Sequence, residues 1–269
     1  MLMKPPKGTM LSRGDPLARG LVGCWLMNEG GGNIVNDLSG NYYTANFNSN
    51  TAWVAAKYGN GTYYNGTDDA VNGNYPDWRS ADHAGTVVMW INPSALTGFH
   101  TIFSTSDEGT TTSYIAIRVS SAGVLQLVQQ NAADTLTLVY EDTYLIPVNT
   151  WTQIVVVSDG SQYKFYINSL LQATKTSAGS NNGDWFADTT LRDNFCFSST
   201  HVTSYSGEFF GTIDHVLIYN RSLSASEIAQ LYREPFGMFE REPIELWTAT
   251  MGGGAAPSNM IYDYRVRVG

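Results

Sequence analysis

The sequence predicts an all-β protein: a two-sheet antiparallel jelly-roll sandwich with one short C-terminal helix and extended terminal arms. About ten short segments rich in β-branched and aromatic residues alternate with turn residues, at spacings of roughly 8–12 positions. Among the 269 residues, 26 are Gly, 16 are Tyr and only 14% are charged, which suits short strands and turns. No period of roughly 20–50 residues repeats, which disfavours a solenoid or a propeller.

The first half of the chain supplies most of the predicted strands. Residues 1–19 contain scattered Pro and Gly without periodicity, which predicts an N-terminal arm. Strands are then expected at Leu21–Asn28, Thr86–Ile91, Thr101–Ser104, Tyr114–Val119, Val124–Gln129 and Leu136–Tyr140.

The clearest hairpin spans Trp151–Asn168. Two apolar runs flank Asp159 and Gly160, a pair that favours the positive φ angles of a tight hairpin turn. Leu170–Thr174 continues the antiparallel meander.

A strand and a short helix are expected to close the sandwich within Gly207–Tyr232. Thr212–Tyr219 is rich in β-branched and aromatic residues. Ser224 and Glu227 have the spacing of a capping box, in which each side chain bonds the other's backbone at a helix start. Pro235 ends this helix.

The predicted division of the chain is an arm at residues 1–19, a sandwich at 20–232 and a C-terminal extension at 233–269. Residues 251–257 form a glycine-rich linker, and residues 261–268 alternate like a strand. Such a tethered strand pairs with an open sheet edge, either its own or a neighbour's. The expected assembly residues are Ile261, Tyr262, Tyr264, Val266 and Val268.

The charge balance disfavours nucleic acid and anionic membranes as partners, because 15 basic residues face 24 acidic ones and the net charge is −9. Neither a secretory signal nor a run of about 18 apolar residues is seen, so no transmembrane helix is expected. The expected location is a virion surface or the extracellular space, reached by a route other than a signal peptide.

Several motifs occur in a fixed order: LVGCWLMNEGGG, DLSG, TVVMWI, NTWTQIVVVSDGSQYKFYIN and GTIDHVLIYNRSLSASEIAQLY. Together they resemble a laminin G-like domain of the concanavalin A-like lectin/glucanase superfamily, over residues 20–232. The resemblance implies a jelly roll of two antiparallel sheets. It also points to proteins of phage or bacterial metagenomes.

Catalysis is not expected. Glycanases of the superfamily carry three acids on one strand, spaced E-x-D-x-x-E. The nearest spacing here is Glu240, Glu242 and Glu245, where the middle acid is Glu and Pro243 would disrupt a central strand. The four histidines show neither metal-ligand nor triad spacing.

Calcium is the expected cofactor, as a structural ion implied by the resemblance. In relatives, such an ion often joins an early turn acid to an acid near the last strand. Glu29 and Asp214 hold the matching positions, with Asp37 as a further candidate. The alternative is turn chemistry, in which an Asp side chain bonds its own backbone.

Glycan contacts are expected from aromatic residues in loops. Trp78, Trp185 and Phe186 lie in loop segments flanked by Asp and Asn and are the predicted ligand-binding residues. The alternative is packing at the sandwich rim or in a protein interface.

The function that best fits these patterns is a non-enzymatic structural and recognition protein of a phage virion surface, either a capsid decoration or a tail-associated adhesin. It would assemble with copies of itself or other virion proteins through its terminal arms and bind host-surface glycans. The first alternative is a calcium-dependent carbohydrate-binding module of a bacterial surface or secreted protein. The second is a glycoside hydrolase.

Overall fold

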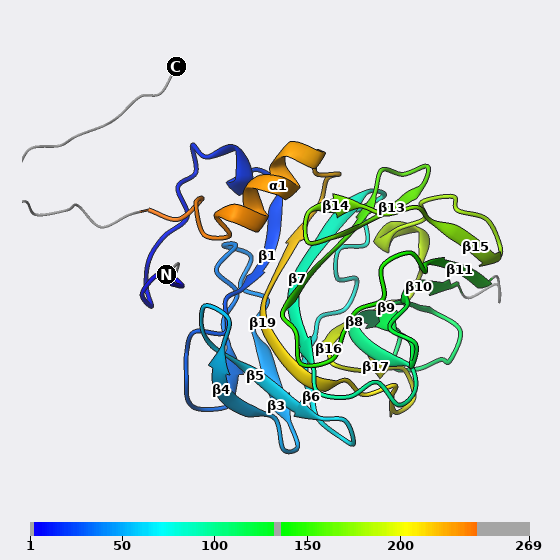
Figure 1. Ribbon diagram of the computed structural model, residues 1–269, viewed down its shortest axis with the longest axis horizontal. Coiled ribbons are helices and arrows are strands. Elements are labelled where there is room, and N and C mark those ends of the chain that lie inside the picture. The colour runs from blue at the N-terminus through cyan, green and yellow to red at the C-terminus, as the bar shows by residue number, and fades with distance from the viewer. Residues whose placement is uncertain (1–2, 132–135, 241–269) are drawn as a thin grey trace, which may run out of the picture.

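Two large antiparallel sheets face each other across a hydrophobic core in the computed structural model, which describes residues 3–131 and 136–240 (Figure 1). The predicted fold class is therefore confirmed. Among these residues, one α-helix follows the last long strand, as the capping box predicted: α1 (Ala225–Arg233). Short 3-10 turns lie at Pro16–Ala18 and Phe186–Asp188.

The last long strand of the described sequence lies in the interior of the first sheet. Its order in the described residues is β14 (Leu170–Leu171), β13 (Tyr163–Ile167), β12 (Thr152–Ser158), β7 (Gly85–Pro93), β19 (Phe210–Tyr219), β5 (Gly59–Asn65) and β4 (Ala52–Ala56). β1 (Leu21–Trp25) also pairs with β19. β19 thus pairs with β5 along its first part and with β1 along its second, while β7 lies on its other side.

The second sheet contains most of the strands between residues 100 and 141. Its order is β15 (Lys175–Ala178), β11 (Leu136–Glu141), β10 (Leu125–Gln130), β9 (Tyr114–Val119), β8 (His100–Ser106), β16 (Asn194–Phe197), β6 (Ala70–Asn74), β3 (Ala45–Asn48) and β2 (Ile34–Val35). A small hairpin, β17 (Thr200–His201) with β18 (Tyr205–Ser206), lies against β8.

The predicted hairpin is present as β12 and β13. Ser158 pairs with Tyr163, and Gly160 between them has φ 80°, which confirms the turn that Asp159-Gly160 indicated. β7 pairs with β12 in register from Gly85–Ser158 to Ile91–Thr152.

The two sheets differ in how they are covered. The outer face of the first sheet packs against α1 and the N-terminal segment, through contacts that join Val155 and Leu217 to Leu17 and Ile228. Strands buried on both faces read as continuous apolar runs, which explains the composition of β7 and β12. In the second sheet, β11 alternates between buried and more exposed residues, and β9 and β10 do so except at Ala116 and Val128, which are buried.

The N-terminal segment lies against the sandwich and meets the end of the described chain. Leu11 forms a bridge with Phe239, and the Ser12 backbone N–H donates to the Met238 carbonyl at 2.8 Å. The predicted division at residues 20 and 232 stays a prediction. The assembly residues expected at 261–268 lie outside the described part of the chain.

Candidate functional site

The outward face of the second sheet follows from the alternation along two of its strands. In β9, Ile115 and Ile117 point into the core, so Tyr114, Ala116 and Arg118 point outward. In β10, Leu125 and Leu127 belong to the core, so Gln126, Val128 and Gln130 point outward. This face carries both aromatic and polar side chains.

Strand register sets these side chains in rows across the sheet. Arg118 pairs with Thr101 of β8 on one side and with Gln126 of β10 on the other. Gln126 in turn pairs with Tyr140 of β11. The Arg118 Nε donates to Gln126 Oε1 at 2.9 Å, which fixes the guanidinium along the row.

A groove of about 450 Å³ lies where this face meets the β17–β18 hairpin. Small Ala116 leaves room between Tyr114 and Arg118, while Thr101 Oγ1 lies 3.0 Å from Thr200 Oγ1 and ties the hairpin to β8. The lining residues are Phe99, Thr101, Thr111, Tyr114, Ala116, Arg118, Thr200, Val202, Ser206 and Gly207.

The groove combines a cation with aromatic faces. The Arg118 guanidinium carbon lies 4.1 Å from the centre of the Phe99 ring, and Phe99 is 53% exposed. Burial lowers the pKa of Arg118 and raises the pKa of Tyr114. Because an arginine side chain keeps its charge in proteins and a raised pKa keeps the phenol protonated, the groove presents a guanidinium beside a neutral phenol. None of its lining residues is Asp or Glu.

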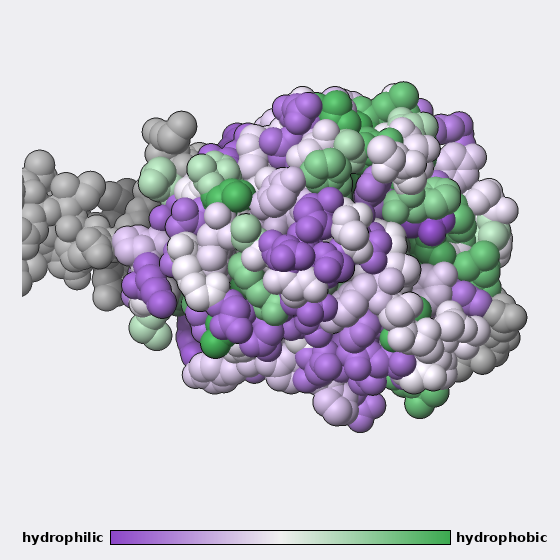
Figure 2. Space-filling view, turned by 90° about the horizontal axis from the view of Figure 1, so that it is seen from below, coloured by the Kyte–Doolittle hydropathy of each residue, from purple (hydrophilic) through white to green (hydrophobic). Residues whose placement is uncertain are grey.

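Hydrophobic residues also gather at one end of the molecule. In Figure 2 they collect at the end of the molecule opposite the grey trace, which is the end where Figure 1 places β9, β10, β11 and β15. Hydrophilic residues lie among them in the same view. Such a mixed surface suits a ligand that has both apolar faces and hydroxyl groups.

The three aromatic residues predicted to bind a ligand are in the core instead. Trp78, Trp185 and Phe186 are 1%, 0% and 0% exposed, so the expectation that these rings are open to solvent is wrong. Their ring centres lie 4.6 Å apart for Trp185–Phe186 and 5.2 Å apart for Trp78–Phe186. No aromatic face remains on them for stacking against a sugar.

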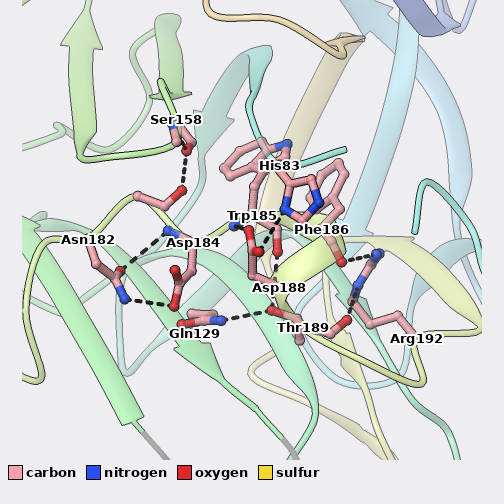
Figure 3. A network of polar contacts seen from close by, with 12 residues as sticks. His83, Gln129, Ser158, Asn182, Asp184, Trp185, Phe186, Asp188, Thr189 and Arg192 are labelled. Carbon is pink, nitrogen blue, oxygen red and sulfur yellow. Dashed lines mark hydrogen bonds and ion pairs between the residues drawn. The ribbon is translucent and has the colours of Figure 1, made fainter. Parts of the chain in front are cut away.

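A network of hydrogen bonds fixes the loop that carries Trp185 and Phe186 (Figure 3). Buried Arg192 donates to the Thr189 carbonyl at 2.8 Å, the Trp78 carbonyl at 3.0 Å and the Phe186 carbonyl. Asp188 accepts from the Trp185 backbone N–H at 2.8 Å. These bonds turn the aromatic rings inward, a long-range effect that local sequence does not reveal.

Two of the predicted metal ligands have backbone partners of their own. Asp37 accepts from the Cys24 and Ser39 N–H groups, both at 2.8 Å, as turn chemistry would have it. Glu29 Oε1 accepts from the backbone N–H of Asn36 at 2.8 Å, whereas its Oε2 is buried without a partner among the described residues.

The third predicted ligand, Asp214, is fully buried and its carboxylate has three close partners. Oδ1 lies 2.6 Å from His215 Nδ1 and 3.0 Å from Lys4 Nζ, and Oδ2 accepts from the Tyr58 N–H at 2.9 Å. Burial alone would raise the pKa of Asp214, but the His215 hydrogen bond and the Lys4 charge hold it below its usual value. Calcium binding at these acids stays a prediction.

The groove residues do not stand out in the sequence, because the aromatic residues expected to contact a sugar lie in predicted loops. The signal was present in Tyr114–Val119 and Leu125–Gln130, where alternation predicts one open face. The alternation does not predict that the β17–β18 hairpin, which is distant in the sequence, lines one side of that face.

The fold is a two-sheet β-sandwich, and the comparison with family models identifies its superfamily. A model described as the concanavalin A-like lectin/glucanases superfamily matches residues 65–229, more than half of the chain. The protein therefore belongs to this superfamily. A search of curated proteins found no match.

Solved structures share the fold at low sequence identity. The CBM40 of the Ruminococcus gnavus IT-sialidase matches with TM-score 0.54 and 16% identity, covering 64% of this chain and 96% of its own. Domain 4 of AbnA, a GH43 extracellular arabinanase from Geobacillus stearothermophilus, in complex with arabinotriose, has TM-score 0.59 and 17% identity, over 79% and 98%. The binding domain of Paraclostridial Mosquitocidal Protein 1 has TM-score 0.61 and 16% identity, over 82% and 53%.

No helix among the described residues is long and apolar enough to cross a membrane.

Proposed function

We propose that this protein binds glycans, without catalysing their cleavage, in the groove between the second sheet and the β17–β18 hairpin. The observation that carries the proposal is the set of groups that meet there: the aromatic faces of Phe99 and Tyr114, the Arg118 guanidinium and several hydroxyls. Sugars are bound by aromatic rings that cover their C–H faces and by polar groups that take their hydroxyls.

Two further facts support this proposal. Structural neighbours include carbohydrate-binding modules, among them the CBM40 bound to sialyllactose and an arabinanase domain bound to arabinotriose. Glycoside hydrolysis usually needs two carboxylates flanking the scissile bond, and the groove lining contains neither Asp nor Glu. Both favour binding over cleavage.

The test is a glycan array followed by calorimetric titration of the best ligand. Arg118→Ala removes a charged hydrogen-bond donor, so we expect affinity to fall by about 10- to 100-fold. Tyr114→Ala should weaken binding by removing an aromatic wall. Arg233→Ala on α1, an exposed arginine far along the chain from the groove strands, serves as the matched control and should bind like the wild type.

Unchanged affinity in both groove variants would rule out this groove as the binding site. If the wild type and Glu240→Gln released reducing sugar from a bound glycan at the same rate, the protein would be a hydrolase. Its catalytic acids would then not include Glu240.

The finer part of the proposal is that the module acts on a phage virion surface, as a capsid decoration or tail-associated adhesin. It rests on the wording of the family motifs and on the strand-like pattern at residues 261–268 that follows a glycine-rich linker. A monomeric chain would favour the other candidate, a carbohydrate-binding module of a bacterial surface or secreted protein.

A further inference from the structure

The ammonium of Lys4 is buried in a cage of oxygen atoms. Lys4 Nζ lies 3.0 Å from Asp214 Oδ1, and the two side chains are 3% and 0% exposed. Nζ also donates to the Asp214 carbonyl at 2.7 Å and to the Asn60 carbonyl. A lysine ammonium has three N–H donors, so these three oxygens, the cation cage, use its whole hydrogen-bonding capacity.

The segment around Lys4 is held in place independently of the ammonium. The Lys4 backbone N–H donates to the Tyr58 carbonyl at 3.0 Å. On the next residue, the Pro5 carbonyl accepts from Asn28 Nδ2 at 3.0 Å. Lys4 is therefore positioned by its backbone, unlike a surface lysine whose side chain meets a carboxylate by chance.

The cation cage as it stands fits an ammonium better than calcium. Calcium takes about six to eight oxygens at roughly 2.3–2.6 Å, whereas the cage offers three oxygens around Nζ at hydrogen-bond distance. No group of three or more His, Cys, Asp or Glu within the described residues could hold a metal. Glu29, whose charge acts on Lys4, keeps one buried oxygen without a partner among the described residues.

We propose that Lys4 is the resident cation of this sandwich and takes the place that a structural calcium would take between the early turn acid and Asp214. The N-terminal segment carries its own positive charge into the cage, so the fold needs no divalent ion. This inference does not depend on glycan binding, and its readouts are stability and metal binding.

The first test is thermal unfolding of the full chain in 5 mM EDTA and in about 5 mM CaCl2. We expect the wild-type Tm to be the same in both, because the cage is filled. Lys4→Met keeps the apolar stem but leaves Asp214 buried without its cation, so its Tm in EDTA should fall by about 5–15 °C. Lys7→Met, at an exposed lysine of the same segment, is the matched control and should match the wild type.

The second test is calorimetric titration with CaCl2. Wild-type protein should show no calcium binding, because the Lys4 ammonium occupies the cage. Stoichiometric calcium binding by the wild type, or a Lys4→Met variant as stable as Lys7→Met, would overturn the proposal. The result of the wild-type titration does not depend on whether any variant folds.

Discussion

At the scale of single residues, the carboxylates of this protein differ chiefly in what surrounds them. Asp37 and Asp214 are buried and accept hydrogen bonds from backbone N–H groups. Glu227 caps α1: its Oε2 accepts from the Ser224 N–H at 2.8 Å, and its Oε1 lies 2.7 Å from Arg221. The same functional group, a carboxylate, thus stabilises a turn in Asp37, binds a buried cation in Asp214 and caps a helix in Glu227.

Glu227 gives a pH-dependent prediction. Burial alone would raise its pKa, but the Arg221 hydrogen bond and the Ser224 contacts lower the pKa of Glu227 to about 2. A lowered pKa stabilises the folded state above the unfolded value of about 4.3, and this contribution is lost as pH falls toward 2. At pH 7, Glu227→Gln should reduce the free energy of unfolding by about 0.5–2 kcal/mol.

Urea unfolding at pH 7, 4 and 2.5 measures this difference. We expect the gap between wild type and Glu227→Gln to narrow steadily as the pH falls. Exposed Glu234→Gln at the end of the same helix is the control and should show no such trend. A gap that stays constant with pH would mean that the cap acts through its geometry alone.

At the scale of elements, the first sheet depends on close contact between a strand and a loop. A Cβ at Gly85, the first residue of β7, would lie 2.2 Å from Trp185 Nε1 and 2.7 Å from the Tyr219 carbonyl. This glycine therefore lets the loop that carries Trp185 and Phe186 seat its rings in the core. The inward position of those rings is fixed from β7 as well as from Arg192.

We predict that Gly85→Ala displaces this loop. Overpacking at such a contact costs about 1–3 kcal/mol, so the urea midpoint should fall and tryptophan fluorescence should shift to the red. Gly98→Ala is the matched control, because its Cβ would meet no atom within 4 Å. A Gly85→Ala variant with wild-type fluorescence and midpoint would show that the loop has room to adjust.

The elements themselves were largely predictable from the sequence. Tyr114–Val119 was predicted with the bounds that β9 has, and the Asp159-Gly160 turn and the capping box of α1 are where their local chemistry puts them. Local sequence patterns could not predict which side chains are exposed to solvent. Whether Trp185 faces solvent depends on Gly85, and what surrounds Asp214 depends on Lys4, 210 residues earlier.

At the scale of the whole molecule, both chain segments that flank the sandwich contribute to it. The N-terminal segment supplies Lys4 to the cage and Leu11 to a bridge with Phe239, so residues outside the matched family region cover the first sheet. The virion proposal extends this idea to contacts between molecules, through the pattern at residues 261–268.

Self-association of the full chain is the corresponding prediction. Native mass measurement should find an oligomer for the wild type and a monomer for the double variant Tyr262→Asp, Tyr264→Asp, since charges on one strand face disrupt pairing and packing. Phe99→Asp, in the groove, should assemble like the wild type. A monomeric wild type would remove the basis for assembly through this segment.

The position of β19 has a consequence for how the protein is made. Residues 210–219 fill the gap between β7 on one side and β1 and β5 on the other, yet the ribosome adds them after all three partners. Until then, the nascent chain holds apolar strands with unpaired edges, the form most prone to stick to other chains. Folding of the first sheet must therefore wait until residues 210–219 have been synthesised, and the growing chain needs protection from aggregation until then.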